Sequence, residues 1–155
     1  MQFVKQSVIR ATPERVFEFH AQSDALTLLT PPWERARVIR PASISEIGSR
    51  AIVEVSVLGV FKVKWVAEHT AYDPPHFFED IQIEGPFKTW RHRHIVEDHP
   101  DGAALRDEIT YEPPMGLIGR LIAPLIVERR LNKLFDYRHD VTRRWCEMPE
   151  PELKS

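Results

Sequence analysis

The sequence has little cysteine, and this limits the chemistry available to the chain. Cys146 is the only cysteine among 155 residues, so no internal disulfide can form and a reducing compartment is expected. No histidine partner for this thiol is evident in the sequence, which argues against a cysteine nucleophile. The sequence also has no Gly-rich phosphate loop, nucleophile elbow or dinucleotide fingerprint.

The sequence also lacks an excess of basic charge and any long apolar run. Lys and Arg (21) nearly balance Asp and Glu (23), so we expect no nucleic-acid binding. No apolar run reaches the roughly 18 residues of a membrane span, and residues 1–10 lack the apolar segment of a signal peptide. We therefore expect a soluble cytoplasmic protein without stable membrane insertion.

The composition is that of one globular domain, with 43% hydrophobic and 28% charged residues. We assign residues 1–147 to this domain and residues 148–155, which include Pro149 and Pro151, to a disordered tail. No internal repeat and no earlier linker divides the chain.

The longest amphipathic segment is the C-terminal one, from Met115 to Cys146. Its apolar residues recur at helical spacing in two rows. The first row is Leu117, Ile118, Leu121, Ile122 and Leu125, and the second is Val127, Leu131, Leu134, Arg138, Val141 and Trp145. Pro124 falls where the rows meet, and a proline inside a helix bends it. We therefore predict one long helix, kinked at Pro124, whose apolar stripe covers another surface.

The rest of the chain begins with a strand and two short helices. Phe3, Val4, Val8 and Ile9 alternate loosely in a strand over residues 2–10. Thr12-Pro13-Glu14 is a helix start, with a capping hydroxyl, a proline that loses no hydrogen bond and an acid in the first turn. Ser23-Asp24 begins a second helix, which Pro31-Pro32 must end.

From Glu34 onward the hydrophobic period changes to two, which indicates strands. Turn-forming residues at Gly48, Gly59, Gly85-Pro86 and Pro100-Asp101-Gly102 separate them. The expected strands cover residues 34–40, 51–58, 61–69, 77–84, 88–98 and 104–112. Short loops between successive strands predict an antiparallel meander. The fold class is therefore α+β: a strand, two short helices, about six antiparallel strands, and a long C-terminal helix packed across the curved sheet.

Four motifs give the chain a resemblance to a known family. They are Leu29-Thr30-Pro31-Pro32-Trp33, Asp80-x-Gln82-x-x-Gly85-Pro86, Trp90-x-His92-x-His94 and Phe135-Asp136-Tyr137-Arg138. The chain resembles the START-like or SRPBCC superfamily, which has the helix-grip fold. Within it, the motifs resemble a bacterial ligand-binding branch related to polyketide cyclases and coenzyme-Q-binding proteins. The resemblance implies that residues 1–147 form a START-like ligand-binding domain.

The segment from Trp90 to Val96 carries two histidines that share one face of a strand. Residues two apart point the same way, so His92 and His94 face the interior while Arg91 and Arg93 face solvent. If Gly85-Pro86 sets the register, Asp80 lies opposite His92 and Gln82 opposite Trp90. If Asp101-Gly102 sets the register between this strand and the one over residues 104–112, Asp107 lies opposite Val96 and Tyr111 opposite His92.

This polar group admits three interpretations. It is a structural hydrogen-bond network, or a polar end to an apolar ligand pocket, or a reactive site. In the last case His92 or His94 is a general acid or base tuned by Asp80 or Asp107, or a metal ligand. No third metal ligand stands at a recognisable spacing, so we expect neither a metal nor a cofactor. His69 is expected in the core, and the remaining histidines are expected in solvent: His20, His76, His99 and His139.

We expect a protein that binds a hydrophobic or aromatic small molecule, of lipid, polyketide or quinone type, between the long helix and the sheet. The alternative is an enzyme of the polyketide cyclase or hydrolase type that uses the same cavity. An accessory protein acting through an exposed face is a third possibility, which the charged outward residues of the strands disfavour. The expected ligand-binding residues are Trp65, Asp80, Gln82, Trp90, His92, His94, Asp107, Tyr111, Leu117 and Leu121. No residue is assigned a catalytic role.

Overall fold

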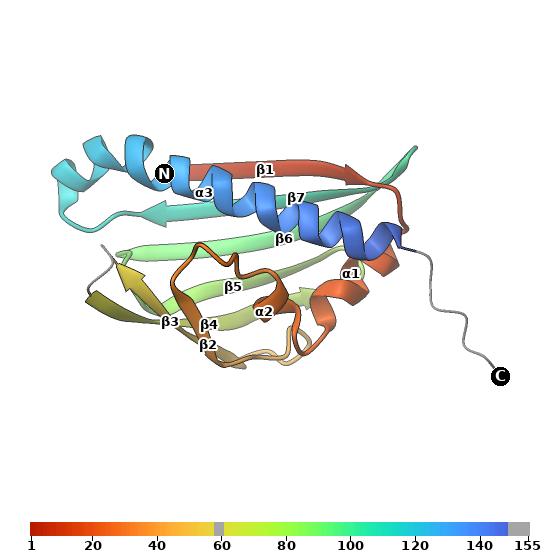
Figure 1. Cartoon of the computed structure of the whole chain (residues 1–155), viewed down its shortest axis with the longest axis horizontal. Helices are drawn as coiled ribbons and strands as arrows, with labels where there is room; N and C mark the ends of the chain where they lie inside the picture. The colour runs from red at the N-terminus through yellow and green to blue at the C-terminus, as the bar shows by residue number, and fades with distance from the viewer. Residues whose placement is uncertain (58–60, 149–155) are drawn as a thin grey trace.

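The computed structural model describes residues 1–57 and 61–148 and shows an α+β fold (Figure 1). The strands are β1 (Gln2–Ile9), β2 (Ala36–Arg40), β3 (Arg50–Val57), β4 (Phe61–Asp73), β5 (Phe77–Glu84), β6 (Thr89–His99) and β7 (Gly102–Glu112). The helices are α1 (Pro13–Ala21), α2 (Ala25–Leu28) and α3 (Gly116–Glu147). This order confirms the predicted one. The turn expected at Gly59 and residues 149–155 of the expected tail lie outside the described residues.

The described strands form one antiparallel sheet in the order β1-β7-β6-β5-β4-β3-β2. Strands β2 to β7 form the expected meander, and β1 pairs with β7, so the first and last strands of the chain are neighbours. On the outer face, opposite charges pair across adjacent strands. Lys62 Nζ lies 2.8 Å from Glu54 Oε1, and Arg91 Nη2 lies 2.7 Å from Glu79 Oε2. The outer face is therefore the solvated one, as the charge pattern predicts.

The two short helices begin and end where local chemistry requires. The Thr12 hydroxyl accepts a hydrogen bond from the Arg15 backbone N–H, and Pro13 occupies the first turn of α1. Helix α2 stops at Leu28, before Pro31-Pro32. These helices lie against one end of the sheet, where α1 packs on β6, β7 and the C-terminal half of α3 (Figure 1).

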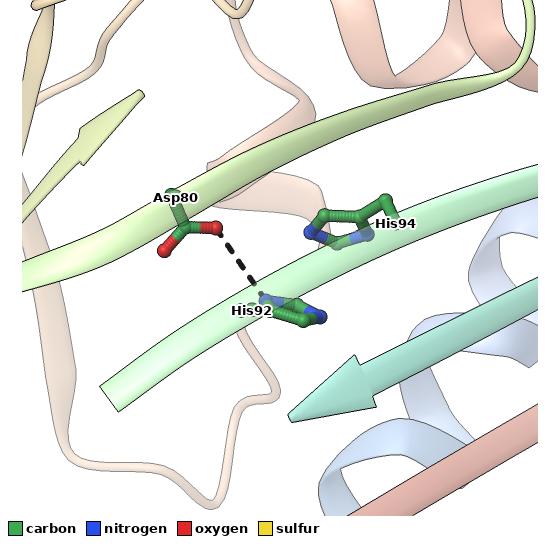
Figure 2. A group of neighbouring side chains, drawn as sticks. All are labelled: Asp80, His92 and His94. Atoms are coloured by element: carbon green, nitrogen blue, oxygen red, sulfur yellow. Dashed lines mark ion pairs between the residues drawn. The ribbon is translucent and has the colours of Figure 1, made fainter. Parts of the chain in front are cut away.

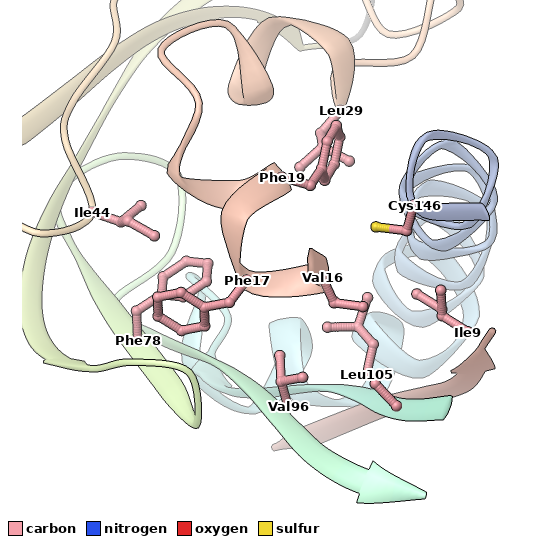
Figure 3. Close-up of a cluster of buried hydrophobic side chains, with 11 residues drawn as sticks. Ile9, Val16, Phe17, Phe19, Leu29, Ile44, Phe78, Val96, Leu105 and Cys146 are labelled. Atoms are coloured by element: carbon pink, nitrogen blue, oxygen red, sulfur yellow. The ribbon is translucent and has the colours of Figure 1, made fainter. Parts of the chain in front are cut away.

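The main hydrophobic core lies at that end of the molecule (Figure 3). Side chains of α1 meet inward residues of the sheet and the last turns of α3. The buried members of this cluster are Ile9, Val16, Phe17, Phe19, Leu29, Ile44, Phe78, Val96, Ala103, Leu105 and Cys146. Phe17 and Phe78 pack edge to face with ring centroids 5.7 Å apart. This core fixes α3 at its C-terminal end.

Helix α3 runs without interruption from Gly116 to Glu147 and contains Pro124. Its second half lies along β1 and β7 (Figure 1). The most deeply buried positions there are Leu131, Phe135, His139, Thr142 and Cys146, spaced by three or four residues. The prediction of an amphipathic helix on the sheet is confirmed for this half. The buried stripe is rotated by about one residue from the predicted row, because Phe135 and His139 lie inside it while Leu134 and Val141 are only partly buried.

The first half of α3 differs from the prediction. Its apolar row does not cover the sheet: Leu117 is 78% exposed and Leu121 is 79% exposed. In Figure 1 the first turns of α3 project past the N-terminal end of β1, so no strand lies beneath them. The chain therefore leaves a row of large apolar side chains in solvent: Met115, Leu117, Ile118, Leu121, Leu125 and Ile126.

Candidate functional site

Polar side chains from four strands and α3 meet on the inner face of the sheet. Asp80 pairs with His92 across β5 and β6, as predicted. The predicted register between β6 and β7 is wrong by two residues, because His99 lies opposite Gly102 and the loop residues are Pro100 and Asp101.

The corrected register changes the partners of both β7 residues. Asp107 lies directly opposite His94, and Tyr111 lies opposite Trp90. Gly102 has φ +135°, and a β-carbon there would meet the Ile9 carbonyl, so this position needs glycine. The required glycine ends the turn, whereas the prediction placed it within the turn.

Asp107 is the centre of the polar cluster and is only 2% exposed. Its Oδ1 lies 2.8 Å from His92 Nε2 and 2.6 Å from His94 Nδ1, while its Oδ2 lies 2.6 Å from His139 Nε2. An ionised carboxylate only accepts hydrogen bonds, so the nitrogens facing it carry the protons. One buried carboxylate therefore orients His92 and His139 by hydrogen bonds and lies beside His94, whose Nδ1 has no hydrogen-bond partner among the described residues.

Two histidines predicted to be solvated belong to this buried region. His139 is 2% exposed, and its Nδ1 lies 2.9 Å from the Ser7 hydroxyl of β1. His20 is 7% exposed; its Nδ1 lies 2.9 Å from the Val16 carbonyl, and its ring centroid lies 5.5 Å from that of His94. The spacing of His139 from Leu131 and Phe135, at eight and four residues, was the signal that could have placed it inside.

The other histidine predictions agree with the structure. His92 and His94 are buried, at 4% and 7% exposed, and His69 is buried on β4. His76 is exposed and His99 is partly exposed.

Asp80 faces His92 Nδ1, whereas Asp107 faces His92 Nε2. Figure 2 shows the Asp80 carboxylate beside His92. Its Oδ2 is 3.5 Å from His92 Nδ1, and its side chain is 14% exposed. His69 of β4 pairs with Asp80 from the other neighbouring strand, so the carboxylate has a histidine on each side. Asp80 thus forms the more open edge of the cluster.

Burial determines the protonation of these groups. It lowers the pKa of His94 and of His20 to about 4, and it lowers the pKa of His92 and of His69. Burial also raises the pKa of Asp80. Burial alone would raise the pKa of Asp107 too, but His94 and the hydrogen bonds from His139 and His92 hold it well below its usual range. At neutral pH His92 and His94 are therefore neutral imidazoles beside an ionised Asp107 carboxylate.

An aromatic cluster lies beside the polar group. The Trp65 and Trp90 rings meet edge to face at 5.0 Å, and Phe87 lies 4.8 Å from Trp90 and 5.5 Å from Tyr111. The Tyr111 hydroxyl is buried and has no hydrogen-bond partner among the described residues. The amide of Gln82 is occupied, because it donates to the Phe87 carbonyl and accepts from the Phe87 N–H.

The structure brings eight of the ten predicted site residues to this inner face: Trp65, Asp80, Gln82, Trp90, His92, His94, Asp107 and Tyr111. It does not bring Leu117 and Leu121 there, because both side chains are nearly fully exposed. The enclosed cavity expected among Trp65, Trp90 and these two leucines is therefore not formed. The α3 residues that reach the aromatic cluster are Ala123, Val127, Leu131, Leu134 and Phe135.

A known protein family matches most of the chain. The family model described as polyketide cyclase / dehydrase and lipid transport matches residues 9–135. The chain belongs to this family. The family is of the SRPBCC type, so the resemblance seen in the sequence motifs is confirmed. No curated protein matches the sequence.

Solved structures share the fold at low sequence identity. Protein CV1439 from Chromobacterium violaceum is 14% identical with a TM-score of 0.73, covering 96% of this chain and 99% of that one. TTHA0849 from Thermus thermophilus is 20% identical with a TM-score of 0.70, and the match covers 92% of this chain and 97% of TTHA0849. The di-domain ARO/CYC StfQ from the steffimycin biosynthetic pathway is 11% identical with a TM-score of 0.73, covering 94% of this chain and 50% of StfQ. These likenesses establish the helix-grip fold, which is a ligand-binding one in this family. Among the described residues, no helix is both long enough and apolar enough to cross a membrane.

Proposed function

We propose that the protein binds a hydrophobic or aromatic small molecule, of lipid, polyketide or quinone type, between the first half of α3 and the aromatic inner face of the sheet. The observation that carries this proposal is the exposed apolar row of α3 beside the aromatic cluster. Leu117 and Leu121 stand in solvent one to two turns before Ala123 and Val127, which contact that cluster. A small molecule that covered both surfaces would remove apolar area from water on each.

Partly buried apolar side chains on the inner face of the sheet also support the proposal. Val53 pairs with Trp65 and Val55 with Val63, and all four side chains are only partly buried. Helix α3 lies along the opposite edge of the sheet, over β1 and β7 (Figure 1). The β3 and β4 half of this face is thus an apolar surface that a ligand could contact.

Polar groups suited to a ligand head group lie next to this surface. The unpaired Tyr111 hydroxyl can donate one hydrogen bond and accept another. Asp80 and the outer edge of the histidine cluster are close enough to solvent to exchange water for a ligand. The family description, which combines polyketide and lipid chemistry, agrees with an apolar ligand that carries oxygen groups.

Two measurements test the proposal. Native mass spectrometry of the purified protein should show a small molecule that dissociates on activation. An anilinonaphthalene sulfonate probe should gain fluorescence with wild type and lose about tenfold in affinity with Leu121→Asp, because burying the new carboxylate is costly. Ile47→Asp is the matched control, since Ile47 is 58% exposed in the loop between β2 and β3. Equal loss of affinity in both variants, or none in either, would contradict the site.

An enzyme of the polyketide cyclase or hydrolase type is a second candidate. The observation that favours it is Asp107, which contacts both His92 and His94 and can orient either as a general acid or base. The alignment with StfQ, which is described as an ARO/CYC protein, agrees with this candidate at the level of fold. The test is cyclisation of a linear β-polyketone by wild type and by His94→Gln. Turnover that is unchanged in the variant would exclude His94 as the acid-base group.

A further inference from the structure

Three potential metal ligands converge on the open side of the polar cluster. One ligand atom each from Asp80, His92 and His94 can be chosen so that all three lie within 4.8 Å of one another. The residues come from the adjacent strands β5 and β6, and Asp80 lies directly opposite His92. A paired sheet is a rigid support, so the three groups are held on one surface. The register expected from Gly85-Pro86 already placed Asp80 opposite His92, but Asp80 stands at no recognisable metal-ligand spacing in the sequence and was not predicted to be a metal ligand.

The hydrogen bond to Asp107 points one nitrogen lone pair of His92 at Asp80. His92 Nε2 is hydrogen-bonded to the Asp107 carboxylate and carries the proton, so His92 Nδ1 is unprotonated. His94 Nδ1 lies 2.6 Å from the same carboxylate oxygen but makes no hydrogen bond among the described residues. His92 Nδ1 lies 3.5 Å from Asp80 Oδ2, and Figure 2 shows a ring nitrogen of His94 directed towards the same carboxylate.

The His92 lone pair and the Asp80 carboxylate repel one another unless a cation or a proton lies between them. The cluster holds two carboxylates, Asp80 and Asp107, against the single guanidinium of Arg138, which donates to the Leu29 carbonyl. His69, on the far side of Asp80, has a buried Nδ1 with no partner among the described residues. The two carboxylates and the unprotonated His92 nitrogen both favour a positive ion between Asp80 and the histidines.

The observed spacing is close to that of a metal site. Two ligands bound at about 2.1 Å to a tetrahedral ion lie roughly 3.4 Å apart. The His92 Nδ1 to Asp80 Oδ2 separation of 3.5 Å meets this requirement without movement, and the ligand atom of His94 lies within 4.8 Å of the other two. A histidine that binds metal through one nitrogen normally donates its other N–H to a carboxylate, and Asp107 provides that partner for His92.

We propose that Asp80, His92 and His94 bind one divalent first-row transition-metal ion, of which Zn²⁺ is the expected case. Asp107 does not bind the ion but orients His92 through a hydrogen bond. Two nitrogens and one carboxylate oxygen leave a coordination position for water or for an oxygen atom of a bound molecule. The site does not depend on the proposed binding of a hydrophobic molecule, since the ligands belong to the protein alone.

The test uses metal ions alone on tag-free, chelator-treated full-length protein. We expect one Co²⁺ per chain, visible as d–d absorption bands, and stoichiometric displacement by Zn²⁺. Asp80→Asn should lower the affinity for either ion by at least about tenfold, because even the removal of an outer-shell partner has that effect. His99→Gln is the control, because His99 is partly exposed at the end of β6 and should bind as wild type does. Folded wild type that binds no Co²⁺, or Asp80→Asn that binds equally well, would overturn the proposal.

A second measurement needs no variant. In ¹⁵N NMR spectra of the histidine side chains, Zn²⁺ should shift His92 Nδ1 and His94 Nε2 while the signals of His139 remain those of a ring bonded to Asp107 and Ser7. Shifts at His76 or His99 in place of these would show binding at the surface and would also overturn the proposal. Neither experiment involves the apolar probe, so failure of the metal site leaves the small-molecule result unaffected.

Discussion

Asp107 supports the polar interior of the protein because three imidazoles share its two oxygens. Asp107→Ala should lower the free energy of unfolding by about 3 kcal/mol or more, since buried imidazole N–H groups would lose their acceptor. Asp80→Ala should cost less than about 1 kcal/mol, because Asp80 is partly exposed and water can replace it. Urea unfolding monitored by circular dichroism measures both values.

The comparison of the two aspartates separates a purely structural network from a site open to ligands. Asp140→Ala is the control, because Asp140 is exposed on α3 and its substitution should change the stability by no more than about 0.5 kcal/mol. If Asp80→Ala destabilised the protein as strongly as Asp107→Ala, Asp80 would be part of the structural network and not of a ligand site.

Cys146 should be unreactive in the folded protein. It is 5% exposed, and burial raises the pKa of its thiol to about 12. At pH 8 the thiolate fraction is then about a thousandfold smaller than for an ordinary thiol with a pKa of about 8.5. Iodoacetamide should therefore modify Cys146 only after unfolding in urea, as mass spectrometry would show. Rapid alkylation of the folded protein would contradict the assigned burial.

At the scale of single elements, the two halves of α3 should respond differently to truncation. Leu131→Ala should lower the free energy of unfolding by about 2–4 kcal/mol, because Leu131 is buried in the aromatic cluster. Leu121→Ala should change it by less than about 0.5 kcal/mol, because the side chain is 79% exposed. Equal losses from the two substitutions, measured by urea unfolding, would show that the first half of α3 also packs on the sheet.

Pro124 lies between these halves, and the bend expected there remains a prediction. Pro124→Ala restores a backbone N–H inside the helix and should raise the melting temperature. If the bend holds the exposed row away from the sheet, the same substitution should weaken binding of the apolar probe. Increased stability with unchanged probe affinity would mean that Pro124 has no role in binding.

The sequence predicted the elements well because hydrophobic period and turn residues are local signals. The limits of β5 agree with the expected 77–84, and Thr12-Pro13 starts α1 as its chemistry requires. The register of β6 on β7 was wrong because the dipeptide Asp101-Gly102 did not reveal which residues form the turn. His139 was placed in solvent because the predicted and the observed buried faces of α3 differ by a rotation of about one residue. The two faces carry similar numbers of apolar residues, so the sequence did not separate them. Both errors concern how elements meet, which depends on contacts distant in the chain.

At the scale of the whole molecule, the fold is one sheet that is only partly covered. Helices α3 and α1 cover the β1, β7 and β6 side of the sheet (Figure 1). Aromatic residues of β4, β6 and β7 pack against α3 in the aromatic cluster. The polar cluster lies between the main core and the aromatic cluster, because His92 contacts Phe135 while His94 stacks on Phe78. A ligand on the inner face would therefore have apolar contacts along its body and polar groups at one end.

The four tryptophans provide the most direct test of small-molecule binding at this face. Trp65 and Trp90 lie in the aromatic cluster, whereas Trp33 packs on Tyr137 and Trp145 on Phe19. When an aromatic probe such as anilinonaphthalene sulfonate is titrated into ¹⁵N-labelled protein, the indole N–H signals of Trp65 and Trp90 should shift together and saturate at one equivalent. The signals of Trp33 and Trp145 should stay in place. Saturable shifts confined to Trp33 or Trp145, or no saturable shift at any tryptophan, would contradict binding between α3 and the sheet.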